Sequence, residues 1–216
     1  MKVIIFGATG MVGQGVLREC LLDPDVTEVL AVGRTATGQT HAKLRDLVHA
    51  DLAHWTGAED ELAGSDACFF CLGVSAAGMS EQAYTRVTYD YTLAAAKALA
   101  KVSPGTTFIY VSGQGTDAKA RSMWARVKGK TEDDVRALPL KAVMFRPGLI
   151  RPLHGIRSRT RLYRIGYVVL WPFLPLISAA GALTTTERVG KAMLKVARDG
   201  APKPFMSNRD INALVK

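Results

Sequence analysis

Short hydrophobic runs alternate with amphipathic stretches along most of the chain. Several of the stretches between the runs repeat their apolar positions at helical spacing. Alternation of this kind predicts parallel strands joined by helices that cover both faces of one sheet. The predicted strands are 3–6, 28–32, 46–50, 67–72, 106–111 and 141–145, and the predicted helices include 11–22, 80–102 and 123–138.

A last amphipathic segment lies near the end of the chain. Thr184 and Glu187 have the spacing of a capping box, in which two side chains bond backbone N–H groups at a helix start. Gly200 is of the residue type that often ends a helix. The apolar positions between them recur at helical spacing and predict a terminal helix: Val189, Met193, Val196 and Ala197.

The first predicted strand breaks into a glycine-rich turn that runs directly into a helix. In such a turn one glycine permits the tight bend, a second lets the backbone approach a pyrophosphate, and a third lets the helix pack close to the strand. The helix start adds free N–H groups and the positive end of its dipole. We therefore predict a dinucleotide site with contacts from Gly7, Thr9, Gly10, Met11, Val12 and Gly13.

These elements together indicate an α/β protein with a Rossmann-type, doubly wound parallel sheet. With 216 residues the chain fits one such domain and a modest extension. We expect an NAD(P)-binding domain at 1–150. Residues 151–216 would form a small helical segment packed on the same domain, serving as a substrate lid or an interaction surface.

The charge and the cysteines restrict the partners and the compartment. A formal net charge of +9 suits anionic ligands, but no helix-turn-helix, zinc-finger or RNA-binding pattern is present, so we expect no nucleic-acid partner. Cys68 and Cys71 have redox spacing, yet strand residues three apart point to opposite faces, so we expect buried free thiols and no metal site. The lack of a secretory signal and the cysteine content predict a cytoplasmic protein.

The second predicted strand ends beside Arg34, at the position where an acidic residue holds the ribose hydroxyls of NAD. A guanidinium there suits a 2′-phosphate, so we expect NADP(H) to be preferred over NAD(H); the alternative is a solvated surface charge. Further contacts are expected where the third and fourth strands end. They are Asp51, which can accept from the adenine amino group, Leu52, Cys71, Leu72 and Gly73.

Five motifs occur in a fixed order: Gly7-Ala-Thr-Gly-Met-Val-Gly13, Cys71-Leu-Gly-Val-Ser75, Tyr110-Val-Ser-Gly-Gln-Gly115, Val127-Lys-Gly-Lys130 and Phe145-Arg-Pro-Gly148. With them the chain resembles atypical short-chain dehydrogenases/reductases of the NAD(P)-binding, epimerase-like group. Within that group it is most similar to the branch of the Tat-interacting-protein oxidoreductase and its bacterial relatives. The resemblance covers residues 1–150 well and the terminal helix more loosely.

The resemblance implies a site built from a Ser, a Tyr and a Lys. Ser112 would orient a substrate carbonyl or hydroxyl, and Lys128 would hold the nicotinamide ribose. Pro147 and Gly148 would line the nicotinamide side. Trp124 stands where the proton-transferring Tyr is expected, and an indole N–H has no proton to give near neutral pH. The usual acid–base step is therefore in question, whereas cofactor binding is not.

Other tyrosines are candidates for the missing acid. Tyr110 lies two residues before Ser112 and should share its strand face, but a buried core position is the more natural interpretation. The third predicted helix carries the remaining candidates, for which packing is the more common role: Tyr84, Tyr89 and Tyr91.

Residues 157–183 combine arginines with a long uncharged stretch. The stretch is long enough for a membrane span, but Pro172 and Pro175 argue against one continuous helix. Three interpretations stay open. In the first, which we favour, the segment is a lid over an apolar pocket or a self-association face. In the second it rests on an anionic membrane surface, and in the third it spans the membrane.

Two functions remain open from the sequence. The first is an NADP-dependent oxidoreductase acting on a small or lipophilic carbonyl or alcohol, with Ser112, Lys128 and an unidentified proton source. The second is a non-catalytic NADPH-binding redox sensor or partner-binding protein, which the tryptophan at position 124 favours.

Overall fold

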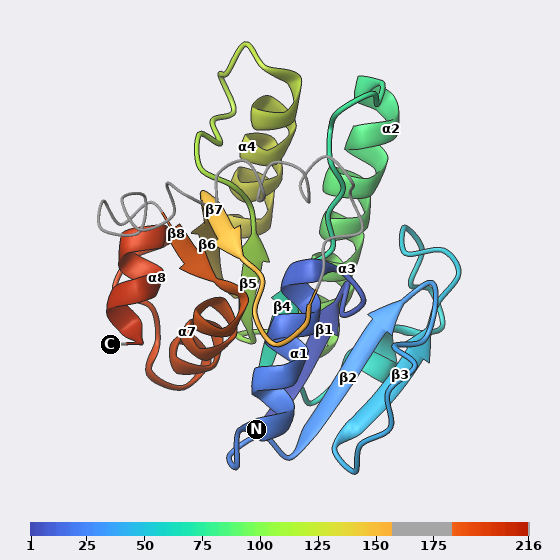
Figure 1. The fold of residues 1–216 in the computed structure, drawn as a ribbon. Coiled ribbons are helices and arrows are strands. Elements are labelled where there is room, and N and C mark those ends of the chain that lie inside the picture. Colours follow the sequence, from blue (N-terminus) through green and yellow to red (C-terminus); the bar gives the residue numbers. More distant parts are fainter. Residues whose placement is uncertain (157–182, 216) are drawn as a thin grey trace.

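A seven-stranded parallel sheet forms the centre of the computed structural model, which describes residues 1–156 and 183–215 (Figure 1). The strand order is β3-β2-β1-β4-β5-β6-β9. The order of the strands along the sheet reverses between β1 and β4, although all the strands run parallel. Doubly wound sheets bind their ligands at this point, outside the carboxyl ends of the strands. The strands are β1 (Lys2–Phe6), β2 (Glu28–Gly33), β3 (Leu44–Val48), β4 (Ala67–Phe70), β5 (Thr107–Val111), β6 (Lys141–Arg146) and β9 (Phe205–Ser207).

Helices cover both faces of the sheet, which confirms the predicted fold class (Figure 1). Successive residues of β1 point to opposite faces, so Val3 and Ile5 pack with one set of helices and Ile4 and Phe6 with the other. The first set is α1 (Met11–Leu22), α7 (Thr186–Asp199) and α8 (Asn208–Leu214), and the second includes α3 (Tyr91–Val102) and α4 (Met123–Arg136).

Shorter elements complete the described chain. Strands β7 (Leu149–Arg151) and β8 (Leu183–Thr185) pair in parallel as a second, small sheet. A 3₁₀ turn, η1, spans Glu59–Leu62. The predicted helix over 80–102 is continuous but has three parts, because a π-helical turn, η2 (Arg86–Asp90), joins α2 (Glu81–Thr85) to α3.

Some predicted boundaries are wrong. The third strand covers 44–48 instead of 46–50, because its pairing with β2 begins at Leu44 opposite Val29. The fourth strand ends at Phe70, and Cys71 and Leu72 belong to the loop that follows.

The predicted capping box is also shifted. Thr185 caps α7 by accepting from the Arg188 N–H at 3.1 Å. Thr184 instead belongs to β8, and its hydroxyl donates to the Asn212 side chain at 2.8 Å. Pairing with β7 therefore places Thr184, the predicted cap, inside strand β8.

Close packing joins the C-terminal residues to the first helix. A Cβ on Gly15 would lie 2.5 Å from Thr186 Cβ, and one on Gly190 would lie 2.7 Å from Glu19 Cγ. The two glycines therefore let α1 and α7 approach more closely than larger residues would permit. β9 then adds to the sheet beside β6, so residues after 183 belong to the same core.

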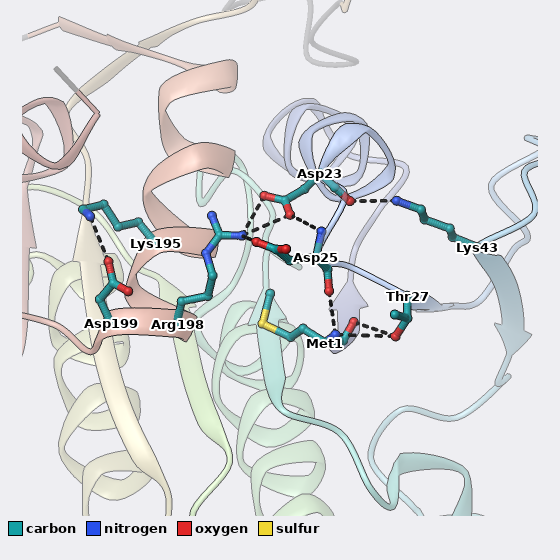
Figure 2. A network of polar contacts seen from close by, with 8 residues as sticks. All are labelled: Met1, Asp23, Asp25, Thr27, Lys43, Lys195, Arg198 and Asp199. Carbon is teal, nitrogen blue, oxygen red and sulfur yellow. Dashed lines mark hydrogen bonds and ion pairs between the residues drawn. The ribbon is translucent and has the colours of Figure 1, made fainter.

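Polar contacts strengthen this attachment (Figure 2). Arg198, at the end of α7, bonds the Asp23 carboxylate at 2.9 and 3.0 Å and the Asp25 carboxylate at 3.1 Å. Lys43, before β3, donates to the Asp23 carbonyl at 2.7 Å, and the Met1 amine donates to the Asp25 carbonyl at 2.6 Å. The loop after α1 is thereby tied to three distant parts of the chain.

The three cysteines are free thiols, and Cys68 and Cys71 pack into the two different cores on opposite faces of the sheet. No group of potential metal ligands occurs within residues 1–156 and 183–215. The segment 157–183, with the lid, self-association and membrane interpretations, lies outside the described residues except for its last position. Among the helices that are described, none is long and apolar enough to cross a membrane.

Candidate functional site

The glycine turn between β1 and α1 has the geometry of a phosphate cradle. Gly7 has φ of +78°, and a Cβ there would lie 2.7 Å from Leu72 Cα. A Cβ on Gly13 would lie 2.1 Å from the Gly7 carbonyl oxygen, so only glycine lets the helix start this close to the strand. Gly10 is the N-cap of α1 and makes no side-chain cap bond, which leaves N–H groups for an anion.

The loop after β4 lies against this cradle. The Cys71 N–H donates to the Phe6 carbonyl at 2.9 Å, so the loop continues the pairing of β4 with β1. Leu72 then passes so close to Gly7 that a Cβ on this glycine would lie 2.7 Å from the Leu72 nitrogen. The structure thus brings together two predicted cofactor segments that are separated by about sixty residues, and Gly73 follows as an exposed backbone position.

The predicted adenosine-side residues differ in how freely they can bind. Arg34, the predicted 2′-phosphate contact, is exposed directly after β2. Asp51 accepts from the Ala53 N–H at 3.0 Å and contacts His54 Nδ1 at 2.8 Å, and these bonds lower the pKa of its carboxyl. Leu52 is buried, and its carbonyl already accepts from the Trp55 indole N–H at 3.1 Å.

Lys128 lies at the carboxyl end of β5, as its predicted role requires. Its ammonium donates to the carbonyls of Val111 at 3.3 Å and Ser112 at 3.0 Å. Burial lowers the pKa of Lys128 to about 8, and the nearby Glu132 carboxylate opposes this effect. Helix α4 comes so close to the chain before it that a Cβ on Gly129 would lie 2.1 Å from the Ala118 nitrogen.

Ser112 is less available than predicted. It follows β5, and its side chain is buried, with the hydroxyl 2.9 Å from the Thr116 hydroxyl. Its N–H donates to Phe145 O at 2.8 Å, which fixes the backbone in the ladder with β6. If the Thr116 hydroxyl donates this bond, the Ser112 hydroxyl keeps its own hydrogen for a substrate oxygen.

Trp124 lies in the first turn of α4 against the loop that follows β5. Its ring atoms are 3.9 and 3.6 Å from the positions that Cβ atoms on Gly113 and Gly115 would occupy. The indole is partly exposed. The residue at the expected Tyr position thus places its six-membered ring beside the glycine-rich loop that follows Ser112.

The other candidate tyrosines are either buried in the core or hydrogen-bonded away from Ser112. Tyr110 is 1% exposed, and burial raises the pKa of its phenol far above its ordinary range. Tyr84 and Tyr91 are buried in the helical layer. Tyr89 donates to the Asp134 carboxylate at 2.6 Å, between η2 and α4. The structure therefore gives no support to Tyr110 as the proton donor.

A buried ion pair joins α4 to the end of β6. Glu132 is 1% exposed and accepts from Arg146 through both carboxylate oxygens, with Nε at 3.0 and 3.2 Å. A second guanidinium nitrogen of Arg146 contacts the same carboxylate, and the guanidinium lies over the Phe205 ring. The pair holds the helix of Lys128 beside the strand that leads into Pro147. Sequence reasoning missed it, although Glu132 follows Lys128 by one helical turn.

Gly148 is held by two side chains that sequence reasoning also missed. Asn208, the first residue of α8, accepts from the Gly148 N–H at 3.2 Å and donates to the Leu149 carbonyl at 3.3 Å. The Gln114 side chain lies so close that a Cβ on Gly148 would be 2.3 Å from its oxygen. Pro147 is buried and accepts from the Gln114 N–H at 2.9 Å.

The fold and the glycine cradle define a nicotinamide-dinucleotide-binding class of protein. The family model described as "NAD dependent epimerase/dehydratase family" matches residues 3–130. The chain therefore belongs to the NAD-dependent epimerase/dehydratase family, and its relatives are atypical short-chain dehydrogenases/reductases.

Two curated relatives are fungal proteins. The chain is 33% identical over 168 residues to "Protein fmp52, mitochondrial" of Emericella nidulans, covering 74% of this chain and 70% of the relative. It is 30% identical over 204 residues to "Protein FMP52-2, mitochondrial" of Scheffersomyces stipitis, covering 92% and 88%.

Solved structures share the fold at low sequence identity. Bordetella bronchiseptica WbmF in complex with NAD⁺ matches with a TM-score of 0.69 at 14% identity, over 98% of this chain and 76% of that one. MoeE5 in complex with UDP-glucose and NAD matches with a TM-score of 0.71 at 16% identity, over 96% and 75%.

The expectation of a cytoplasmic protein is wrong on this comparison, because the relatives are named as mitochondrial proteins. The expectation rested in part on the cysteine content, and free thiols do not distinguish among the reducing compartments inside a cell.

Proposed function

We propose that the protein is an NADP(H)-dependent oxidoreductase acting on a small or lipophilic carbonyl or alcohol. The observation that carries this proposal is the position of Lys128 at the carboxyl end of β5, held by the Val111 and Ser112 carbonyls. A buried cation with a lowered pKa is typical of a functional site. The cradle at Gly7 and Gly13, which a Cβ would fill, supports a dinucleotide pyrophosphate.

The preference for NADP(H) rests on Arg34. Its side chain is exposed at the end of β2, and a guanidinium binds a phosphate through charge-assisted hydrogen bonds. A carboxylate, which would hold the ribose hydroxyls of NAD, is not found at this position.

The bound cofactor would supply or accept a hydride. The chain's own residues would do the positioning: Lys128 donates to the nicotinamide ribose, and the buried Glu132–Arg146 pair keeps its helix in place. Trp124 presents an apolar face, which suits a lipophilic substrate. Because neither Trp124 nor the buried Tyr110 gives up a proton near neutral pH, we assign proton transfer to water.

A second candidate is a non-catalytic NADPH-binding protein. Trp124 at the acid position and the Ser112 hydroxyl bonded to Thr116 both favour it. The first candidate requires the Ser112 hydroxyl to donate to the substrate while it accepts from Thr116, whereas the second requires cofactor binding alone.

Titration with NADPH and NADH, followed by a panel of carbonyl compounds monitored at an absorbance of 340 nm, separates the candidates. Consumption of NADPH supports the oxidoreductase, and tight binding with no consumption across the panel supports the second candidate. Trp124→Tyr restores a proton donor and should raise any turnover. If neither cofactor binds, both candidates fail.

The cofactor preference has its own test. Arg34→Ala should lower the ratio of NADPH to NADH affinity by about 10-fold or more, since a charge-assisted bond contributes about 1.5–3 kcal/mol. Arg188→Ala removes an equally exposed guanidinium from α7 and serves as the control. An unchanged ratio in Arg34→Ala rejects the proposed phosphate contact.

A further inference from the structure

Gln114 is an exposed polar side chain beside the predicted nicotinamide position. The ladder between β5 and β6 continues past both strands, through Ser112 N to Phe145 O at 2.8 Å and Gln114 N to Pro147 O at 2.9 Å. In this register Gln114 lies opposite Gly148. Ser112 follows β5 directly, whereas Gln114 lies in the turn beyond it, at the end of the sheet where the Lys128 ammonium bonds the Val111 and Ser112 carbonyls.

The two side chains differ in what they can reach. The Ser112 hydroxyl is buried and bonded to Thr116, whereas the Gln114 amide lies across the backbone of Gly148. A Cβ at position 148 would be 2.3 Å from the amide oxygen and would displace the amide from this position. Asn208 holds the Gly148 N–H from the opposite end of the chain, so the backbone beneath the amide is fixed.

We propose that the side-chain amide of Gln114 binds the carboxamide of the cofactor's nicotinamide. An amide offers one acceptor and two donors and therefore complements another carboxamide. The Trp124 ring lies beside Gly113 and Gly115, the two neighbours of Gln114 in the same loop. This inference rests on the proposed cofactor binding.

The test compares two ligands that differ at the nicotinamide end. NADPH carries the carboxamide, and 2′-phospho-ADP-ribose lacks it but keeps the pyrophosphate and the 2′-phosphate. Gln114→Ala should weaken NADPH binding about 5- to 50-fold, the effect of one or two neutral hydrogen bonds, and leave 2′-phospho-ADP-ribose unchanged. Dissociation constants from calorimetry provide the readout, and Gln82→Ala, an exposed Gln on α2, is the matched control.

A double variant tests the contact with Gly148. Gly148→Ala pushes the amide away and should weaken NADPH binding, while Gly148→Ala in the Gln114→Ala background should add no further loss. If the losses of NADPH affinity in the two single variants add up in the double variant, the contact is rejected. It is also rejected if Gln114→Ala weakens the binding of NADPH and of 2′-phospho-ADP-ribose equally. If the unmodified protein binds neither ligand, the proposed cofactor site fails together with the inference; unchanged NADPH affinity in Gln114→Ala rejects the inference alone.

Discussion

The pKa of Lys128 leads to a prediction about cofactor binding. Burial lowers this pKa to about 8, so the ammonium is about 90% charged at pH 7 and about 10% charged at pH 9. If the charged form donates to the nicotinamide ribose, NADPH affinity should begin to fall as the pH rises through 8. The total loss should match one charge-assisted hydrogen bond, about 1.5–3 kcal/mol or about 10- to 150-fold in the dissociation constant.

Two variants make the assay specific. Lys128→Met keeps a side chain of similar length without the charge, so its NADPH affinity should be lower at pH 7 and nearly flat between pH 7 and 9.5. Lys130→Met is the control, because Lys130 is exposed, bonded to Asp134 and has a pKa above the ordinary value, so it stays charged throughout. Calorimetric titrations with NADPH, at constant ionic strength, supply the constants.

Two results would refute the reasoning. One is a pH profile of the unmodified protein that matches that of Lys128→Met. The other is a loss of affinity that begins only near pH 10.5, the ordinary value for lysine. Either result would mean that Lys128 is not a charged ligand-binding group with a lowered pKa.

The remaining predictions concern stability. Between pH 8 and 10.5 the unfolded chain holds the Lys128 proton that the folded protein has released, which adds stability as the pH rises, whereas the three cysteine thiols, whose pKa values are raised by burial, lose stability above about pH 9. In urea titrations the free energy of unfolding of the unmodified protein, relative to that of Lys128→Met, should therefore rise with pH over this range. Glu132→Gln removes the carboxylate that pairs with the partly exposed Arg146 guanidinium and should cost about 1.5–3 kcal/mol, measured by urea unfolding at pH 7; an unchanged free energy of unfolding would contradict the assigned ion pair. Gly13→Ala places a Cβ 2.1 Å from the Gly7 oxygen and should abolish NADPH binding while lowering the melting temperature; unchanged binding would show that the cradle is not the cofactor site.

The local pattern predicted most of the sheet and its helices. Apolar spacing identified α1 with its observed bounds and the parallel strands on either side of it. These signals are readable because strand and helix periods differ and because each element buries one face or both. The pattern misplaced the third strand and the cap of α7, where pairing with a neighbouring strand decides the boundary.

The candidate site was predicted in part. The glycine turn and Lys128 are visible in sequence because each needs a particular residue type at a fixed place relative to a strand or helix. Glu132, Gln114 and Asn208 carry no comparable local signal. They reach the site through contacts with Arg146 or Gly148, which depend on the packing of α4, β6 and α8.

The amino-acid sequence alone specified the doubly wound sheet, the phosphate cradle and the absence of a tyrosine at position 124, because periodicity, glycine geometry and residue identity are local properties. Tertiary structure alone decided that the Ser112 hydroxyl is buried against Thr116, that Lys128 has a lowered pKa and that an amide lies over Gly148. Those properties follow from desolvation and from distances between elements far apart in the chain, and neither exists until the sheet has assembled.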